Sequence, residues 1–153
     1  MRFLVQRVTE ASVTVEGEVI GQIGRGFLVF MGVCDTDTEA IADAMVKKLS
    51  GLRIFEDAEG KTNLSLADVG GEVLAVSQFT LYADCRHGNR PSFVRAGSPD
   101  AAERLYEYAV AKLKNDHGLS VQTGSFGADM KVRLLNDGPF TIMLDSDELG
   151  KRG

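Results

Sequence analysis

The sequence predicts a single mixed α/β domain over residues 1–153, in which two helices pack on a curved, largely antiparallel sheet system. Three observations predict this class. The length of 153 residues is that of one domain with a sizeable core. The composition, with 44% hydrophobic and 25% charged residues, is ordinary for a globular protein. The order of patterns along the chain is strands, helix, strand, helix, strands, without a tandem repeat or a low-complexity linker.

The first third of the chain has strand patterns followed by a helix pattern. Residues 5–15 alternate with the period of two that strands have, and Glu16-Gly17 is a turn signal, which predicts a hairpin. Residues 26–33 are a continuous apolar run, typical of a buried strand. A T-x-x-E capping box begins at Thr36, and apolar residues follow at helical spacing, so we predict an amphipathic helix over residues 37–50.

The remainder of the chain repeats this alternation. After the turn-rich segment DAEGKTN, residues 71–83 are apolar and rich in β-forming residues, which predicts a central strand. Ser98-Pro99 is a pair typical of a helix start, and the helix that it opens runs to Asp116 or His117, before Gly118. The chain closes with three strand-like segments, LSVQTGSF, MKVRLLN and FTIMLDS.

The composition also limits where the chain works and what it needs. No apolar run approaches the ~20 residues that cross a membrane, and Gln6 and Arg7 stand where a secretory signal would continue to be apolar. Cys34 and Cys85 are the only cysteines and lie far apart, which favours reduced thiols. Cys85 forms a C-x-H pair with His87, but no second pair completes a zinc site. We therefore expect a cytoplasmic protein with no membrane contact, no metal and no cofactor.

Polar side chains at the end of the predicted central strand are the first candidates for chemistry. The stretch Ser77–Thr80, with the sequence SQFT, leads into the following loop, and strand ends are common places for ligand sites. The plain alternative is a strand whose polar residues alternate outward. A serine or threonine nucleophile needs a base that a third group holds. The two histidines, His87 and His117, lack such a context, so the protein is poorly supplied with a general base.

A basic cluster follows in the stretch CRHGNRPSFVR. It contains Arg86, His87, Arg90 and Arg95 and no acidic residue. Two interpretations stay open, a solvated loop or a loop that contacts phosphate groups. The chain as a whole has 17 Lys and Arg against 22 Asp and Glu, a formal net charge of −5. This charge argues against broad, non-specific binding of nucleic acid but leaves room for a local basic site.

Two glycine-containing segments interrupt the last strand patterns. The segment 124–132, GSFGADMKV, is either a bend in a strand or a place where the backbone approaches a ligand closely. The segment 134–144, LLNDGPFTIML, has Gly138-Pro139 between two apolar stretches. One interpretation is a turn that joins two strands of a hairpin. The other is a cis peptide bond, which fixes an abrupt reversal and makes a rigid backbone that can exclude one shape of ligand.

Five motifs occur in a fixed order along the chain. They are QRVTEASVTVEGEVIGQIGRG near the start, SQFTL at 77–81, RPSF at 90–93, GADM at 127–130 and NDGPFT at 136–141. In this combination the chain resembles the D-aminoacyl-tRNA deacylases, also called D-Tyr-tRNA(Tyr) deacylases, over essentially its whole length. SQFTL together with a C-terminal N-x-G-P-x-T is specific to them, whereas either motif alone is weak. The family often has Val after Gly-Pro, where this chain has Phe140.

The resemblance implies the fold of these deacylases and a cytoplasmic homodimer that acts on the CCA end of aminoacyl-tRNA. Such enzymes hydrolyse the ester between a D-amino acid and the terminal adenosine, and they also remove glycine from tRNA(Ala). By the same resemblance, Arg7 helps to hold a motif, Gly138-cis-Pro139, that reaches across the dimer into the partner's pocket. No metal is required. The residues that line the pocket are Ser77, Gln78, Phe79 and Thr80.

Two mechanisms are compatible with these residues. In the first, the ribose 2′-hydroxyl of the substrate assists hydrolysis, and backbone N–H groups near Phe79 and Thr80 stabilise the oxyanion. In the second, the protein is an esterase with Thr80 as a covalent nucleophile. We favour the first because the sequence has no base beside Thr80.

Two rival functions belong to other classes. One is a protein-only esterase or amidase for small D-amino-acid derivatives, and the other is a non-catalytic module that binds nucleic acid, which the charge of −5 disfavours. If the chain does bind tRNA, the candidate contacts are Arg86, Arg90 and Arg95.

Overall fold

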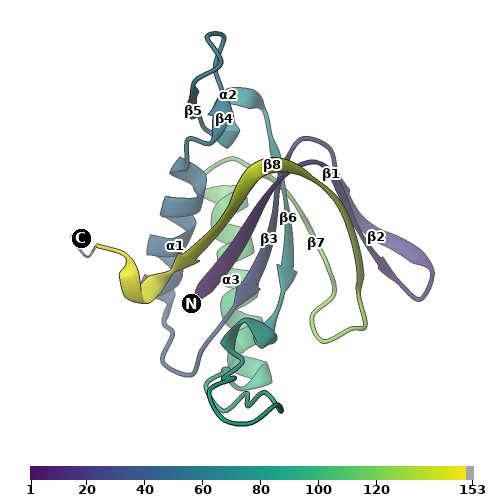
Figure 1. Cartoon of the computed structure of the whole chain (residues 1–153), viewed down its shortest axis with the longest axis vertical. Coiled ribbons are helices and arrows are strands. Elements are labelled where there is room, and N and C mark those ends of the chain that lie inside the picture. Colours follow the sequence, from purple (N-terminus) through teal and green to yellow (C-terminus); the bar gives the residue numbers. More distant parts are fainter. Residues whose placement is uncertain (151–153) are drawn as a thin grey trace.

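The structure, a computed structural model, describes residues 1–150 and has the mixed α/β architecture that the sequence predicts (Figure 1). A six-stranded sheet carries the helices, and a separate two-stranded hairpin projects from it. The elements, in chain order, are β1 (Arg2–Val15), β2 (Glu18–Ile23), β3 (Gly26–Gly32), α1 (Glu39–Gly51), β4 (Phe55–Glu56), β5 (Thr62–Leu64), α2 (Leu66–Val69), β6 (Glu72–Ser77), the 3₁₀ helix η1 (Phe79–Tyr82), α3 (Pro99–Asn115), β7 (Ser120–Thr123), β8 (Lys131–Asp145) and the 3₁₀ helix η2 (Ser146–Glu148).

The long strand β1 organises the sheet because it pairs with three other strands. Its N-terminal half pairs with β3 and its C-terminal half with β2, while β8 pairs along its other edge, and all three pairings are antiparallel. β3 also pairs with β6, and β6 pairs with β7, and both of these pairings are parallel. The sheet is therefore antiparallel only around β1. The other half is parallel because the connections that contain α1 and α3 cross over and return the chain in the same direction.

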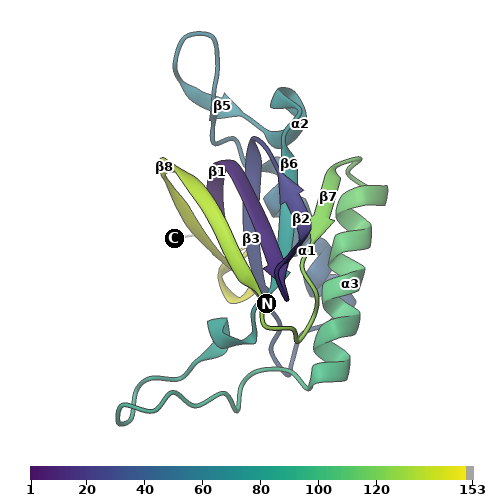
Figure 2. The ribbon, with the colours of Figure 1, turned by 90° about the vertical axis from the view of Figure 1, so that its right-hand side faces the viewer.

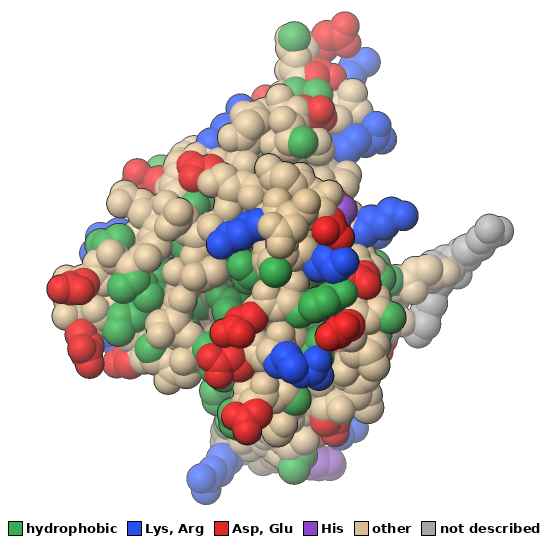
Figure 3. All heavy atoms as spheres, turned by 180° about the vertical axis from the view of Figure 1, so that it is seen from behind, with side chains coloured by type: hydrophobic (Ala, Val, Ile, Leu, Met, Phe, Trp, Pro, Cys, Tyr) green, Lys and Arg blue, Asp and Glu red, His purple; other side chains and the backbone are tan. Residues whose placement is uncertain are grey.

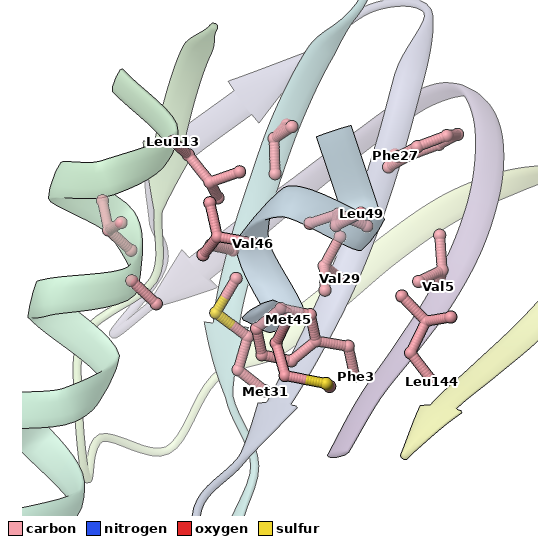
Figure 4. Packing of buried hydrophobic residues seen from close by; sticks show 14 of the residues in the cluster. Phe3, Val5, Phe27, Val29, Met31, Met45, Val46, Leu49, Leu113 and Leu144 are labelled. Atoms are coloured by element: carbon pink, nitrogen blue, oxygen red, sulfur yellow. The ribbon is translucent and has the colours of Figure 1, made fainter. Parts of the chain in front are cut away.

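Two apolar cores lie on the two faces of this curved sheet. The helices α1 and α3 cover one face (Figure 2), where residues such as Phe3, Val29 and Met45 pack against each other (Figure 4). The concave face holds a smaller cluster that includes Val13 and Leu28. Successive residues of a strand point to opposite faces, so an unbroken apolar run such as β3 supplies both cores. Each fully buried side chain of this size stabilises the fold by about 1.5–3 kcal/mol.

The helix starts follow the sequence in one case and depart from it in the other. α3 begins at the predicted Ser98-Pro99 pair. α1 begins later than the predicted residue 37, because Thr38 is its N-cap and its side chain accepts an N–H of the first turn. The capping box predicted from Thr36 is wrong. The carboxylate of Asp37 instead accepts the N–H of Cys34 at 2.7 Å, which holds residue 37 in a turn before the helix. The short helix α2 has no counterpart in the prediction.

Two strand predictions also need correction. The strand predicted over residues 71–83 ends at Ser77, where the chain turns into η1. The two strands predicted on either side of Gly138-Pro139 are one continuous strand, β8, and both of its halves pair with β1. The hairpin-turn interpretation of Gly138-Pro139 is therefore wrong, and this peptide bond is cis. By contrast, the hairpin predicted at Glu16-Gly17 is present, and both turn residues have positive φ.

Candidate functional site

The stretch SQFT lies where β6 ends and the chain turns sharply. Ser77 is the last residue of β6, and Phe79 begins η1. The neighbouring strand β3 has Gly32 opposite this turn. A Cβ at Gly32 would lie 3.1 Å from the carbonyl oxygen of Gln78 and 3.0 Å from Cβ of Leu81. The missing side chain at Gly32 therefore lets η1 fold back closely against β3.

The start of η1 presents backbone donors. The first hydrogen bond within η1 runs from the N–H of Leu81 to the carbonyl oxygen of Gln78, at 3.3 Å. The N–H groups of Phe79 and Thr80 precede this bond, so they have no partner inside η1. The side-chain amide of Gln78 donates to the hydroxyl oxygen of Thr80 at 2.5 Å. The partner of this hydroxyl is thus an amide donor rather than a base.

A cavity of about 270 Å³ opens beside SQFT. Ser77–Phe79 form one side of it, and residues 126–130 between β7 and β8 form another. Tyr106 of α3 also lines it, and its ring centroid lies 6.2 Å from that of Phe126. The greater part of the segment 124–132, for which two interpretations were open, therefore lines the same cavity as SQF. Neither the Tyr106 contribution nor its partner Phe126 was recognised from the sequence, because α3 and this segment are brought together only by the fold.

Few titratable groups line this cavity. The hydroxyl of Tyr106 donates to the carbonyl oxygen of Ala75 at 2.7 Å, and burial raises the pKa of Tyr106 to about 12. This phenol is therefore protonated at neutral pH and does not act as a base. Asp129 also lines the cavity, but its side chain is 85% exposed and pairs with Lys131, with 3.1 Å between Oδ1 and Nζ. Asp129 was not predicted from the sequence, although it stands in the GADM motif. Neither histidine lines the cavity.

The second predicted site, Gly138-Pro139, lies in an outward bulge of β8. Gln6 of β1 pairs with Thr141, and the next paired residue of β1, Val8, pairs with Asn136. The four residues 137–140 therefore stand opposite Arg7 alone. Extra residues in one strand bend it away from its ladder. The Gly-Pro dipeptide consequently marks a protruding bulge within a strand that continues on both sides.

The side chain of Arg7 holds this bulge. Arg7 is only 4% exposed, so its positive charge is buried. Its guanidinium donates to the carbonyl oxygens of Asp137 and Gly138, both at 3.1 Å, and to that of Ile54 at 2.7 Å. It also pairs with the Asp137 carboxylate at 3.2 Å and lies over the ring of Phe140, 4.6 Å from its centroid. Arg7 thus replaces the ladder bonds that the bulge interrupts.

Within one protomer, the structure does not bring the bulge to SQFT. Ser77 is aligned through β3 with Phe3 of β1, whereas the bulge stands opposite Arg7. Four residues along a strand correspond to roughly 13 Å, at about 3.3 Å per residue. Two strands, β1 and β3, also separate β8 from β6. No residue of the bulge lines the 270 Å³ cavity.

The basic cluster lies on the loop between η1 and α3. Arg86 is neutralised by Asp84, with Nη2 2.8 Å from Oδ2, and this ion pair lowers the pKa of Asp84 to about 2. The cluster thus has an acidic partner just outside the stretch that the sequence singled out. Arg95 lies 5.6 Å from the ring centroid of Tyr82. Neither Arg90 nor Arg95 makes a salt bridge within residues 1–150. The face seen in Figure 3 differs, because acidic and basic side chains are interspersed there.

Comparison with known proteins finds one family model and several close relatives that match nearly the whole chain. The model of the family described as D-Tyr-tRNA(Tyr) deacylase matches residues 4–145. A D-aminoacyl-tRNA deacylase of Desulfitobacterium hafniense (strain DSM 10664 / DCB-2) is 60% identical over 148 residues, 97% of this chain and 99% of the relative. A D-aminoacyl-tRNA deacylase of Thermotoga petrophila is 57% identical over 149 residues, again 97% and 99%.

Solved structures agree with this fold. A structure named c-Myc DNA unwinding element binding protein is 44% identical, covers 95% of this chain and 98% of its own, and superimposes with a TM-score of 0.89. A probable eukaryotic D-amino acid tRNA deacylase is 20% identical with a TM-score of 0.81, which supports the fold alone. Among residues 1–150, no helix combines the length and the apolar character that crossing a membrane requires.

Proposed function

This chain belongs to the D-Tyr-tRNA(Tyr) deacylase family, and from that premise we propose that it hydrolyses the ester bond of D-aminoacyl-tRNA. The products are free tRNA and the D-amino acid. Glycyl-tRNA(Ala) is a second substrate, because a filter that excludes L side chains cannot exclude an achiral residue. The partner is the CCA end of aminoacyl-tRNA in the cytoplasm. The net charge of −5 agrees with an enzyme that contacts only this end of the tRNA.

The cavity beside SQFT receives the terminal adenosine. The rings of Phe126 and Tyr106 and the thioether of Met130 give it an apolar, polarisable surface, which suits the faces of a nucleobase. A base bound there directs its ribose, and the ester on it, toward the start of η1. The ester carbonyl then meets the N–H groups of Phe79 and Thr80.

Hydrolysis follows from this position. Water attacks the ester carbon, the carbonyl oxygen takes up the negative charge, and the two N–H groups stabilise this oxyanion. The bond to the ribose oxygen then breaks, and a proton from the water passes to that oxygen. The ribose 2′-hydroxyl, which is adjacent to the ester, assists the proton transfer. The observation that carries this mechanism is the hydrogen bond from Gln78 to Thr80, because the partner of this hydroxyl is an amide donor and not a base that could take its proton.

Selection between D- and L-amino acids is the task of Gly138-Pro139, which reaches from one protomer of a homodimer into the cavity of the other. Support comes from β8, which pairs only with β1 among the described strands and exposes Leu135 and Met143. An open strand edge with exposed apolar residues favours association. A Cβ on Gly138 would meet only the Asn136 side-chain nitrogen, at 4.0 Å, inside its own protomer. The need for glycine there is consistent with crowding in the partner's site.

The backbone of the bulge acts as a wall against L side chains. An L-amino acid held through its amine and its ester directs Cβ into this wall, whereas a D-amino acid directs it away. Such discrimination by repulsion needs no specific pocket for the side chain, so one enzyme accepts many D-residues.

Deacylation of D-Tyr-tRNA and L-Tyr-tRNA by the purified protein tests this function. We expect release of tRNA from the D-substrate and not from the L-substrate. A D-Tyr-tRNA whose terminal adenosine lacks the 2′-hydroxyl tests the mechanism, and its turnover is expected to collapse. Near-normal turnover of that substrate would favour the alternative, a protein-only esterase with Thr80 as nucleophile.

A further inference from the structure

The loop between η1 and α3 forms an arm whose position is fixed by backbone hydrogen bonds. It is the teal segment that extends from the lower end of the molecule in Figure 2. Asp84 and Ser92 exchange two backbone bonds, at 2.7 and 2.9 Å, which close the far part of the arm. A bond of 2.9 Å from the N–H of Gly97 to the carbonyl oxygen of Val33 ties its end to the strand system. The arm is therefore a defined surface beside the cavity.

An aromatic ring of the arm and one of η1 form an exposed pair at the edge of the cavity. Phe79, which lines the cavity, is 57% exposed, and Phe93 of the arm is 38% exposed. Their ring centroids lie 5.1 Å apart with an angle of 70° between the planes. In this edge-to-face arrangement one ring contacts the other by its edge and leaves ring surface open to solvent. Large exposed aromatic side chains that gather in one place mark a binding surface.

The charge on the arm indicates the kind of molecule that covers this pair. Arg90 and Arg95 lie on the same arm and make no salt bridge within the described part of the chain. The protein as a whole is acidic, and its helical face carries mixed charges (Figure 3). Exposed aromatic rings between arginines suit a single-stranded nucleic acid, because each nucleotide offers a flat base and an anionic phosphate.

We propose that Phe93, packed edge-on against Phe79, is the stacking surface for the nucleotide that precedes the terminal adenosine. Arg90 and Arg95 contact the phosphates of this single-stranded end. The inference rests on the proposed function, because the terminal adenosine in the cavity sets where the preceding nucleotide leaves it. It assigns to the RPSF segment a role in binding the acceptor end rather than in the reaction.

Two substrates, one with and one without the RNA that precedes the terminal adenosine, test the proposal. One is D-Tyr-tRNA, and the other is D-tyrosyl-adenosine, which has the terminal nucleoside alone. For Phe93→Ala we expect KM for D-Tyr-tRNA to rise by about 5- to 150-fold, the range for loss of one stacked base. KM and kcat for D-tyrosyl-adenosine are expected to stay as in the wild type, which also serves as the folding control. Phe93→Trp is expected to restore binding of D-Tyr-tRNA, and Val94→Ala, on the neighbouring exposed side chain, to change neither substrate.

The outcomes separate this proposal from the proposed function. An active wild type whose Phe93→Ala variant treats both substrates alike would overturn the stacking role only. Equal losses on both substrates together with a change of oligomeric state would assign Phe93 to a protein interface, which also overturns it. A wild type that hydrolyses neither substrate would overturn the proposed function itself, and the stacking role with it.

Discussion

The RNA-assisted mechanism and the protein-only esterase mechanism differ in the role that they give to Thr80. Its hydroxyl accepts a hydrogen bond from Gln78, and no histidine lines the adjacent cavity. A nucleophilic role would need a base at this hydroxyl. An RNA-assisted role needs only the backbone N–H of Thr80, which does not depend on the side chain.

Replacing Thr80 by alanine is therefore expected to leave substantial activity. Loss of one neutral hydrogen bond stabilising the turn corresponds to about 0.5–1.5 kcal/mol, or roughly a 2- to 10-fold fall in kcat/KM for D-Tyr-tRNA. Thr80→Ser, which keeps the hydroxyl, is the matched control. A fall on the order of 10⁴ in kcat with unchanged binding, together with a trapped acyl-enzyme in the wild type, would instead identify a nucleophile.

We expect Arg7 to have both a structural and a selective role, because its buried guanidinium holds the bulge. A lysine at this position has one ammonium and cannot form the forked set of bonds. Arg7→Lys is expected to lower the free energy of unfolding by about 1.5–3 kcal/mol, the worth of a lost hydrogen bond to a charged group. The ratio of D- to L-Tyr-tRNA deacylation is expected to fall as well.

Urea unfolding and deacylation assays measure these two effects. The exposed Arg104, which pairs with Glu39 on the helical face, supplies the control, and Arg104→Lys is expected to change stability by no more than about 0.5 kcal/mol. If Arg7→Lys destabilises the protein but leaves the D-to-L ratio intact, the arginine serves the fold and not the selection.

Among the structural elements, the arm between η1 and α3 contains arginines that differ in whether an acidic side chain already pairs with them. Asp84 stays ionised at neutral pH, because its pair with Arg86 lowers its pKa to about 2. Arg86 is therefore already neutralised, whereas Arg90 and Arg95 are available for phosphate groups. The sequence of the basic loop alone does not show this difference between the arginines.

The salt dependence of tRNA binding tests whether Arg90 and Arg95, unlike Arg86, contact phosphate groups. Each phosphate contact to single-stranded RNA contributes about 0.7 to the slope of log K against log salt concentration. Replacing Arg90 and Arg95 together by alanine is expected to reduce the slope by about 1.4, equally for all aminoacyl-tRNAs. Arg86→Ala, the control on the same arm, is expected to change it little. A slope that is unaffected by the double substitution would make the cluster a solvated loop.

At the scale of the whole molecule, the candidate site is divided between two places that one protomer does not bring together. SQFT and its cavity lie at one end of β6, and Gly138-Pro139 lies on the edge strand β8. A symmetric dimer presents the same surface of each protomer to the other, so one interface completes two sites. In the proposed homodimer, we therefore expect activity to be a property of the pair and not of the single chain.

Mixing two inactive variants tests this arrangement. Ala128→Trp fills the adenosine cavity of its own protomer, and Gly138→Trp blocks the cavity of its partner. After exchange of protomers, half of the dimers are mixed and each has one intact site, so roughly a quarter of the wild-type activity is expected to return. The unmixed variants are the controls. No recovery, with mixed dimers present, would mean that each protomer builds its site alone.

Features that depend on neighbouring residues could be predicted from the amino-acid sequence. Alternation, apolar runs and turn chemistry identified the hairpin at Glu16-Gly17, the buried strand β3 and the start of α3. The order of motifs identified the family. Such signals are readable because periodicity and backbone preferences act over a few residues.

Features that depend on strand register and packing became visible in the folded structure alone. A hairpin turn at Gly138-Pro139 stayed open beside the cis peptide bond, because the sequence does not reveal that both halves of β8 pair with one strand. The side chain of Arg7 contacts that bulge across 130 positions of chain, and Asp129 and Tyr106 line one cavity together with Ser77–Phe79. These contacts link segments distant in sequence, and the alignment of strands that creates them is set by burial of whole faces rather than by any local pattern.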